Sequence, residues 1–381
     1  MEEYGREHYQ GIQKTHMRIA IDANEANVES RVGTGQYTSE ILTRLHASSR
    51  HSYSLLLKSP PLPHLPDQKK NWQYKILKPS RAWTRFSLPA HLFTHTNYDV
   101  FFSPAHYLPP ITRSPSVVTV HDLAYEYFPS LFFKSDLYKL RAWTRRAVKK
   151  ATRVIAVSEA TKDDLIKIYE VPESKITVVH NGYNSELFNV KNKIPKQSLS
   201  SYQLRTKNYI LFLGTLQPRK NVIKLVQAFR LLKEGGYKGK LVLAGKVGWL
   251  AEDTLDVIKN SPDHKDIVMT GYVSESTRQA LYAHADVYVL PSLYEGFGVP
   301  VLEAMASGCP VVASNNSSLP EVVGKAGLLF NPSDPADIMR AILEIKQDRE
   351  KYIKKGLKHV KNFSWDKCAS ETLKVITNLS S

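Results

Sequence analysis

The chain has 381 residues, of which 42% are hydrophobic, and a formal net charge of +16 at pH 7. Because single hydrophobic cores usually stop growing below this length, we expect two domains of ordinary size. The mean hydropathy of −0.32 is that of a soluble globular protein and not of a disordered chain. No apolar run reaches the roughly 18 residues of a membrane-spanning helix, and the polar start lacks the order of a secretory signal, so we expect a cytoplasmic protein.

From Met17 onward, short apolar runs rich in β-branched residues alternate with helical stretches, which leaves residues 1–16 as an N-terminal extension. This alternation is typical of a parallel sheet with crossover helices. We predict strands from Met17 and at residues 53–57, 100–102, 116–120, 153–157 and 176–179, and helices at residues 37–47, 137–150 and 159–169. Together they form a first Rossmann-like domain over residues 17–188.

A polar stretch without periodicity, residues 189–206, is interpreted as a linker. The pattern restarts with YILFLG at 209–214 and a helix at 221–233, followed by the strand-like runs KLVLAG, DIVMTG, DVYVLP and PVVAS. We therefore predict a second doubly wound domain over residues 207–362 and a last segment over 363–381. The fold class is α/β, with two Rossmann-like domains facing a central cleft, and ligands of such sheets bind beyond the carboxyl ends of the strands.

The loop after the first strand contains Gly33 and Gly35, in the order R-x-G-T-G-Q-Y. Two glycines so placed resemble a backbone cradle for phosphate, but the full G-x-G-x-x-G order is missing. An ordinary glycine turn is the alternative and is the commoner case.

His121 and Asp122 end the strand VTV and are predicted to point into the interdomain cleft. A single histidine is more often structural than functional, so a substrate role and a packing role both stay open for His121.

Arg219 and Lys220 stand at the start of the helix that follows the strand YILFLG. Cations are unfavourable at a helix N-terminus unless an anion is bound there. When a bond to a diphosphate breaks, the diphosphate gains negative charge. These two side chains would stabilise that charge.

Residues 291–310, PSLYEGFGVPVLEAMASGCP, form the most informative segment. Gly296 and Gly298 allow backbone N–H groups to approach a ligand, and Pro300 suits the first turn of a helix. The free N–H groups of such a helix start are a natural seat for phosphate.

Glu295 and Glu303 flank this helix start, eight residues apart, which corresponds to at most roughly 12 Å along a helix. That reach is comparable with a nucleotide sugar, so the two carboxylates could accept hydrogen bonds from hydroxyl groups at its two ends. The alternative is that Glu295 caps the helix at Val299 while Glu303 makes a surface ion pair.

The positive charge is divided about evenly between residues 1–190 and 191–381, which argues against one dedicated nucleic-acid stripe. Two aromatic and basic segments, RAWTR at 81–85 and RAWTRR at 141–146, could stack bases or lie at a membrane interface. The Lys-rich stretch 346–362 is predicted to be a solvated helix face, with contact to an anionic lipid or substrate as the alternative. Because no nucleic-acid module is recognisable, we prefer packing or peripheral contact with an anionic membrane at its inner face, and no nucleic-acid partner.

Four motifs together resemble glycosyltransferase family 4, which comprises retaining enzymes of the GT-B fold. They are E-G-F-G-x-P-x-L-E from Glu295, G-T-L-x-P-R-K-N from Gly214, the H-D pair at 121–122 and H-N-G at 180–182. The resemblance runs from Met17 almost to the C-terminus. It implies that residues 17–188 form the acceptor domain, that residues 207–362 bind the nucleotide sugar, and that the helix in 363–381 packs back on the N-terminal domain.

The resemblance also implies roles for individual residues. Glu295 would contact the donor sugar, Glu303 the ribose, and Arg219 with Lys220 the diphosphate, while His121 would face the sugar at the reaction centre. The implied catalytic residues are Glu295, His121, Arg219 and Lys220. The implied substrate-binding residues are Gly33, Gly35, Asp122, Gly214, Phe297, Gly298, Val299 and Glu303.

The loop around Gly33 and the run HDLAYEYFP from His121 are most similar to members that use GDP-mannose and build surface polysaccharides. UDP-sugar users share most of the motifs, and Gln36 departs from the arginine common in similar loops. The expected partners are thus GDP-mannose, or a UDP-sugar as the alternative, and a saccharide or lipid-linked acceptor. A glucosyl- or N-acetylhexosaminyl-transferase and a non-catalytic scaffold subunit of the same fold are the rival functions.

No Asp-x-Asp metal site is found among the motifs, and two cationic side chains can do the electrostatic work of a divalent ion. The only cysteines, Cys309 and Cys368, have no metal-ligand spacing and are predicted to be buried apolar groups. We therefore predict retaining transfer that is independent of metal and of any cofactor.

Overall fold

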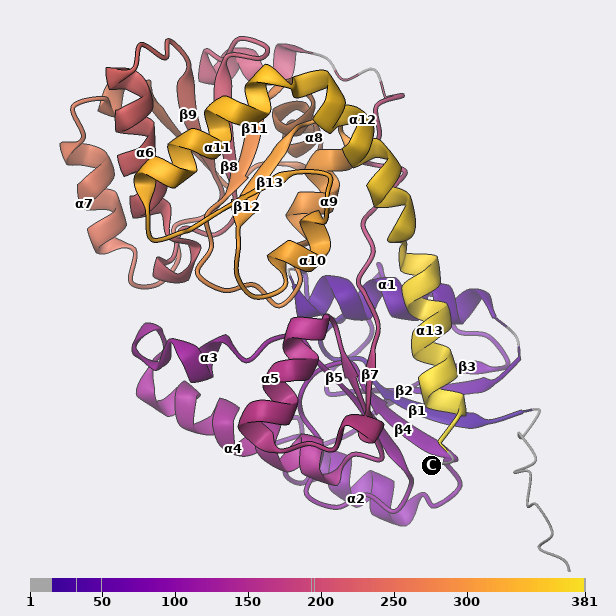
Figure 1. The fold of residues 1–381 in the computed structure, drawn as a ribbon. Helices are drawn as coiled ribbons and strands as arrows, with labels where there is room; N and C mark the ends of the chain where they lie inside the picture. Colours follow the sequence, from indigo (N-terminus) through magenta and orange to yellow (C-terminus); the bar gives the residue numbers. More distant parts are fainter. Residues whose placement is uncertain (1–15, 32, 49, 193, 195, 380–381) are drawn as a thin grey trace, which may run out of the picture.

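The computed structural model describes residues 16–31, 33–48, 50–192, 194 and 196–379 (Figure 1). The predicted extension 1–16 lies outside these residues except for His16. Two parallel sheets, each covered by helices, lie one above the other, and the last helix runs down from the second sheet to the first (Figure 1).

The first sheet has seven parallel strands in the order β3-β2-β1-β4-β5-β6-β7. The strands are β1 Arg18–Asp22, β2 Ser52–Leu57, β3 Trp72–Ile76, β4 Val100–Ser103, β5 Ser116–Val120, β6 Arg153–Ala156 and β7 Ile176–Val178. The central strands β4 and β5 are buried along their whole length, as expected for a sheet covered on both faces. The edge strand β3 alternates polar and apolar residues over WQYKI, and the sequence analysis did not predict it.

Helices cover both faces of this sheet, and alternate residues of β1 belong to two different cores. Ile19 and Ile21 lie in one core with α1, whereas Ala20 lies in the other core with α4. Side chains alternate between the two faces of a strand, which explains this division. The helices are α1 Thr34–Ala47, α2 Ser87–Thr94, α3 Ala124–Tyr127, α4 Lys134–Lys150 and α5 Glu159–Tyr169.

The second sheet has six parallel strands in the order β10-β9-β8-β11-β12-β13. The strands are β8 Tyr209–Leu213, β9 Lys240–Ala244, β10 Ile267–Gly271, β11 Val287–Leu290, β12 Val311–Ser314 and β13 Leu328–Phe330. Its helices are α6 Val222–Glu234, α7 Glu252–Asn260, α8 Glu275–His284, α9 Val299–Ala306, α10 Leu319–Val323, α11 Pro335–Gln347 and α12 Arg349–His359. The strand order reverses between β8 and β11, and a doubly wound sheet binds its ligand at such a switch point.

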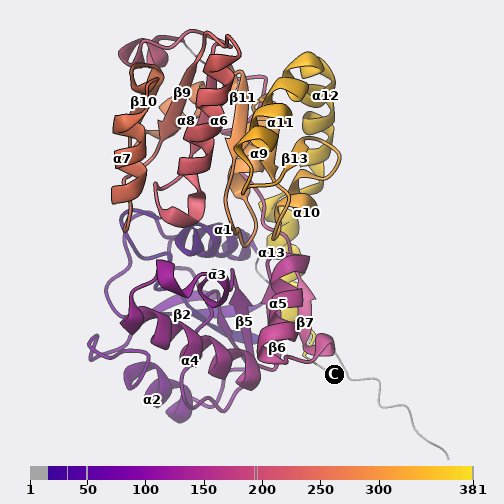
Figure 2. The same cartoon turned by 60° about the vertical axis from the view of Figure 1, so that its left-hand side comes forward.

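The last helix, α13 Trp365–Thr377, packs on the first sheet and not on the second. Trp365, Cys368 and Ile376 are buried in the same core as Tyr37 of α1. Figures 1 and 2 show α13 on one side of the first sheet and α4 on the opposite side. None of the helices in the described part of the chain is both long enough and apolar enough to cross a bilayer.

The start of α13 lies directly against the backbone that follows β7. A Cβ atom on Gly182 would stand 2.1 Å from the nitrogen of Trp365 and 2.3 Å from the carbonyl carbon of Ser364. No side chain fits at these distances, so the third residue of the H-N-G motif is a glycine because the two chain segments touch here.

The substitution Gly182→Ala should lower the free energy of unfolding by about 1–3 kcal/mol, because the added methyl group displaces the start of α13. Urea unfolding monitored by circular dichroism measures the change. The control is Gly235→Ala, where a Cβ atom would meet carbonyl oxygens at 3.4 Å, an ordinary contact. Equal stability of the two variants would contradict the close packing of α13 on Gly182.

Candidate active site at the switch point of the second sheet

The loops that follow β8 and β11 lie side by side at the switch point. The N–H of Leu293 donates to the carbonyl oxygen of Arg219 at 2.8 Å. Asn221, in the left-handed conformation with φ 55°, ends the short turn that carries Arg219 and Lys220. Its side-chain amide donates to the carbonyl oxygens of Pro291 and Pro332. The backbone of the turn is thus fixed to the loop that carries Glu295.

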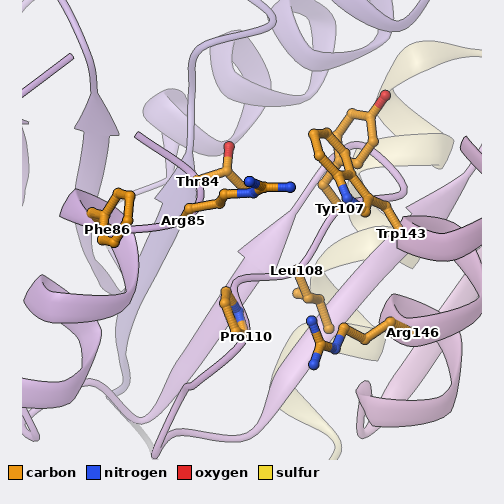
Figure 3. Close-up of a pocket in the computed structure, with 8 residues that line it drawn as sticks. All are labelled: Thr84, Arg85, Phe86, Tyr107, Leu108, Pro110, Trp143 and Arg146. Carbon is orange, nitrogen blue, oxygen red and sulfur yellow. The ribbon is translucent and has the colours of Figure 1, made fainter. Parts of the chain in front are cut away.

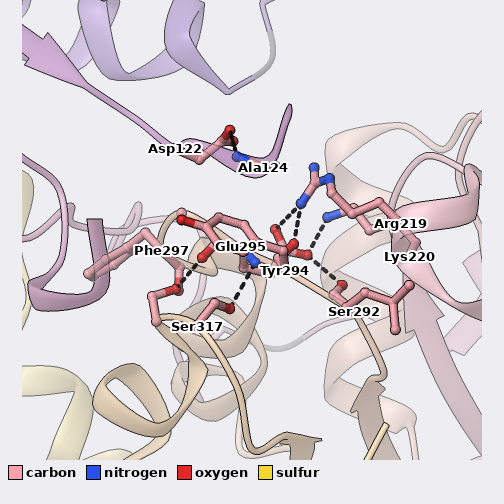
Figure 4. A network of polar contacts seen from close by, with 12 residues as sticks. Asp122, Ala124, Arg219, Lys220, Ser292, Tyr294, Glu295, Phe297 and Ser317 are labelled. Carbon is pink, nitrogen blue, oxygen red and sulfur yellow. Dashed lines mark hydrogen bonds and ion pairs between the residues drawn. The ribbon is translucent and has the colours of Figure 1, made fainter. Parts of the chain in front are cut away.

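Glu295 is the centre of a buried polar network (Figure 4). Its side chain accepts from Lys220 Nζ at 2.5 Å and from Ser292 Oγ at 2.5 Å, and it pairs with Arg219 Nη1 at 3.4 Å. Arg219 also donates to the carbonyl oxygen of Tyr294. The residue is only 8% exposed, so these bonds form away from bulk water.

The network decides the charge state of its members. Burial by itself raises the pKa of Glu295, but the attraction of Lys220 and Arg219 outweighs it and lowers the pKa to about 2. Burial lowers the pKa of Lys220, while Glu295 opposes that shift. Burial also acts to lower the pKa of Arg219, but Glu295 and Asp122 raise it above its ordinary value. Near neutral pH we therefore assign one carboxylate and two cations to the site.

One carboxylate cannot neutralise two buried cations. A buried charge without a full counter-ion is costly, and an anion that enters such a site is strongly favoured. The start of α9 lies beside the network, and the N–H groups of Gly298 and Val299 donate to no acceptor among the residues that the structure describes. Free N–H groups at a helix start favour an anion as well. The arrangement is suited to a phosphate or diphosphate group.

Two serines that the sequence analysis missed hold the loop before α9. Ser317 Oγ accepts from the N–H of Glu295, and Ser318 Oγ donates to the carbonyl oxygens of Glu295 and Phe297. They follow β12, at the same edge of the sheet as the loops after β8 and β11. Their position directly after a predicted strand is the signal that could have identified them.

Glu303 lies on α9, apart from the Glu295 network. Its carboxylate accepts from the hydroxyl group of Tyr282 at 3.2 Å and pairs with Arg278 Nη1 at 3.5 Å. Burial raises the pKa of Glu303, although Arg278 and Tyr282 oppose the shift. The alternative that Glu295 caps the helix while Glu303 makes a surface ion pair is not observed. No side chain caps α9, and Glu303 is only 6% exposed.

The end of β5, in the first sheet, contacts the loop that carries Glu295. A Cβ atom on Gly296 would lie 1.9 Å from the carbonyl oxygen of His121 and 2.9 Å from Asp122 Cβ. Ser158, the N-cap of α5, donates its hydroxyl proton to the carbonyl oxygen of Gly296 at 2.8 Å. The loop between β11 and α9 is therefore in contact with the carboxyl end of the first sheet.

The ring of His121 is held by its neighbours. Its Nε2 lies 2.8 Å from the carbonyl oxygen of Pro104, which can only accept, so Nε2 carries the proton and Nδ1 is the acceptor. Burial lowers the pKa of His121, and the hydrogen bond to Pro104 opposes that shift. Tyr37 of α1 meets the ring edge-on, with centroids 4.8 Å apart.

His106 was also missed by the sequence analysis. Both of its ring nitrogens are enclosed and have no hydrogen-bond partner within the described part of the chain. Burial, followed by the charge of His121, lowers the pKa of His106 to about 4. It follows β4 as His121 follows β5, and β4 and β5 are neighbours. A neutral imidazole with an unused donor and an unused acceptor thus stands next to the predicted reaction centre.

Two further side-chain clusters join the sheets across the site. Asp164 of α5 accepts from the hydroxyl groups of both Tyr127 and Tyr294. Glu321 of α10 contacts His180 Nε2 and accepts from the N–H of Glu159. His180, Tyr127 and Tyr294 belong to segments that the sequence analysis quoted, but their acidic partners Asp164 and Glu321 do not. These contacts join residues more than 30 positions apart, and no local pattern marks the pairing.

The other predicted residues occupy more varied positions. Gly33 is the N-cap of α1 with φ 50°, and a Cβ atom on Gly35 would lie 2.8 Å from the carbonyl oxygen of Glu25. A Cβ atom on Gly214 would meet the Phe212 ring at 3.4 Å and Lys220 Cε at 3.9 Å, which are ordinary contacts. The Phe297 side chain is buried in the core of the second sheet beside His180.

Two families match the chain. Residues 33–187 match the family described as Glycosyltransferase Family 4, and residues 196–359 match Glycosyl transferases group 1. The O-antigen chain mannosyltransferase B of Escherichia coli is 33% identical over 305 residues, which are 79% of this chain and 78% of that protein.

Solved structures share the arrangement of the two sheets. Sucrose-phosphate synthase from Thermosynechococcus elongatus has a TM-score of 0.75 at 19% identity, covering 94% of this chain and 98% of that chain. The HepE protein of Anabaena, in complex with UDP and glucose, has a TM-score of 0.74 at 18% identity, covering 95% and 100%. At these identities the likeness concerns the fold.

The two buried glutamates should respond to pH in opposite directions. Glu295 has a lowered pKa, so its contribution to stability is complete above about pH 4.5 and is lost as the pH falls toward 2. Glu295→Gln should therefore cost about 3 kcal/mol at pH 7 and less at pH 3. Urea unfolding of both proteins from pH 7 to pH 3 measures this difference.

Glu303→Gln is the matched control. Because the pKa of Glu303 is raised, the wild type gains stability relative to this variant as the pH falls through the folded-state pKa. Parallel pH profiles for the two variants would contradict the assigned charges.

Proposed function

This chain belongs to the glycosyltransferases, as a family 4 type member with the GT-B fold, and we propose that it transfers mannose from GDP-mannose with retention of configuration. It is a hexosyltransferase of polysaccharide biosynthesis, and the proposed acceptor is a saccharide or a lipid-linked saccharide. The observation that carries the proposal is the buried cluster of Arg219, Lys220 and Glu295 at the switch point of the second sheet.

The donor diphosphate is proposed to bind beside Arg219 and Lys220 and at the start of α9. Both cations are already fixed by Glu295, so they lose little conformational freedom when an anion arrives. The diphosphate supplies the negative charge that Glu295 alone does not. Gly214 lies next to Lys220 in this scheme, and Gly33 and Gly35 would add backbone N–H groups from the first sheet.

Bond cleavage then follows from electrostatics. The bond from the anomeric carbon to the outer diphosphate oxygen breaks, and its electron pair stays on the diphosphate. Arg219, Lys220 and the α9 amides stabilise this growing charge more than the charge of the bound donor, which lowers the barrier. The acceptor hydroxyl bonds to the same face of the sugar and gives its proton to the departing phosphate oxygen. No metal takes part in this proposal.

The carboxylates are proposed to hold the two sugar rings of the donor. Glu295 accepts from hydroxyl groups of the hexose through the lone pairs that Lys220, Arg219 and Ser292 leave unused. Glu303, which Arg278 and Tyr282 orient, accepts from the ribose. His121 and Asp122 face the hexose from the first sheet, and Phe297 supports the loop from the core side.

Mannose is favoured over other hexoses by the E. coli relative, whose name is that of a mannosyltransferase. A UDP-sugar donor is the alternative, because the cluster recognises the diphosphate and not the base. A non-catalytic scaffold is the second alternative, and the presence of Glu295, His121, Arg219 and Lys220 together speaks against it.

Release of nucleotide tests the donor assignment. The purified protein should release GDP from GDP-mannose and little UDP from UDP-glucose or UDP-N-acetylglucosamine, with the anomeric configuration followed by NMR. Release of UDP alone would select the alternative donor, and no release with any acceptor preparation would favour a scaffold.

Lys220→Met should lower kcat by about 10²–10³, because one cation that stabilises the leaving diphosphate is lost. Methionine keeps most of the volume of the side chain, and Glu295 keeps Arg219 as its partner. The control is Lys224→Met on the following helix, a residue outside the network. Full turnover in the Lys220 variant would contradict the role of the cluster. Glu295→Ala is a weaker test of catalysis, because it leaves two buried cations without a carboxylate and so also affects folding.

A further inference from the structure

The two aromatic and basic segments of the sequence converge on one surface of the first domain. Residues 81–95, 104–115 and 133–150 form this surface, which we call the basic–aromatic surface. Residues from all three segments line one hollow of about 390 Å³ between the start of α2 and α4 (Figure 3). Its walls include Arg85, Phe86, Tyr107, Leu108, Trp143 and Arg146.

The two tryptophans of the repeated segments have different environments. Trp83 is 5% exposed and belongs to the core beneath the surface. Trp143 lines the hollow, where the ring of Tyr107 meets it edge-on with centroids 5.4 Å apart. Core packing therefore explains Trp83, whereas the ring of Trp143 lines the hollow, where a ligand could contact it.

Two arginines extend toward the hollow from opposite sides, Arg85 beside Phe86 and Arg146 from α4 (Figure 3). Both are exposed, and neither forms an ion pair with any residue that the structure describes. The hollow thus combines apolar walls with two cations that have no counter-ion among the described residues.

Large apolar side chains of the basic–aromatic surface are exposed to water, one of them in the hollow and others elsewhere on the surface. Phe86 is 65% exposed, Phe133 at the start of α4 is 61% exposed, and Tyr138 on α4 is 76% exposed. Phe93 is 45% exposed and lies under the guanidinium group of Arg113, which is 4.0 Å from the ring centroid. Clustered exposed aromatic rings beside cations are typical of surfaces that enter a membrane interface.

The positive charge of the first half of the chain is concentrated here. The basic–aromatic surface contains ten Lys and Arg residues and one Asp, whereas the rest of residues 1–190 contains 15 Lys and Arg against 17 Asp and Glu. The even division between the two halves of the sequence therefore conceals a local cluster. An anionic leaflet attracts such a cluster at a distance of about one Debye length.

We propose that the basic–aromatic surface docks on an anionic phospholipid bilayer, with Phe86, Phe133 and Tyr138 in the interface and a lipid phosphate between Arg85 and Arg146. A bilayer fits better than a nucleic acid, because the exposed rings of the surface are chiefly phenylalanines, and one of them lines an apolar hollow. The proposal does not depend on the identity of the sugar donor.

The position of the surface relative to the candidate site is consistent with this partner. Tyr107 in the hollow directly follows His106, and the charge of His121 influences the pKa of His106. The loop after β4 therefore carries Tyr107, which lines the hollow, and His106, which lies next to the predicted reaction centre. A membrane docked at the hollow would contact this loop.

Vesicle co-sedimentation tests the proposal with the full chain. Wild-type protein should bind vesicles of phosphatidylcholine with about one third phosphatidylglycerol and should not bind phosphatidylcholine alone. The double variant R85Q/R146Q should bind about thirtyfold more weakly, the expected effect of removing two cations from an anionic surface. Phe86→Ser should also weaken binding, and its effect should persist at high salt because it removes an apolar contact.

The control is K354Q/K358Q on α12, which removes two exposed cations from the Lys-rich stretch of the second domain. It should bind as the wild type does, and thermal unfolding should show that every variant is folded. Loss of binding in this control but not in R85Q/R146Q would overturn the proposal. Absence of wild-type binding, or preferential retention of duplex DNA at physiological salt, would overturn it as well.

Discussion

The ion cluster of Glu295 with Arg219 and Lys220 is the interaction on which the site depends. It joins the loops after β8 and β11, the two strands between which the order of the second sheet reverses. Because the cluster is buried, each charge needs its partners, and the loss of Glu295 would leave two cations in a region of low dielectric. Because the cations outnumber the carboxylate, the same cluster retains the capacity to bind an anion. Stability and the proposed binding of the diphosphate therefore rest on one set of side chains.

The loop that carries Glu295 also fixes the approach of the two sheets. Gly296 lies so close to the His121 carbonyl oxygen that any side chain would overlap it, and Ser158 of α5 holds its carbonyl group. The serines after β12 hold the other side of the loop. The position of the Glu295 carboxylate thus depends on contacts from both sheets, and the glycine next to it is required by packing before any ligand is considered.

The alternation of apolar runs with helical stretches predicted both parallel sheets, because buried parallel strands are continuous apolar segments. It missed β3 and β13, an edge strand with polar residues and a strand of three residues. The sequence analysis assigned Arg219 and Glu295 to neighbouring parts of one ligand, but it did not predict the direct ion pair between them. His106 and Asp164 could not be predicted, since their surroundings come from segments far apart in the chain.

The segments RAWTR and RAWTRR show that a local pattern does not decide the environment of a side chain. Their sequences are nearly identical, but one tryptophan is in the core and the other lines a hollow.

Asp122 shows how the first sheet takes part in the charge balance of the second. Its negative charge acts to raise the pKa of both Arg219 and Lys220, although it belongs to the loop after β5. It thus supplies part of the counter-charge that Glu295 leaves missing, and its attraction to the cations acts across the two sheets. A bound diphosphate would provide that charge from within the second sheet. The attraction between Asp122 and the cations would then matter less, so the electrostatic force that holds the sheets in contact changes when the donor binds.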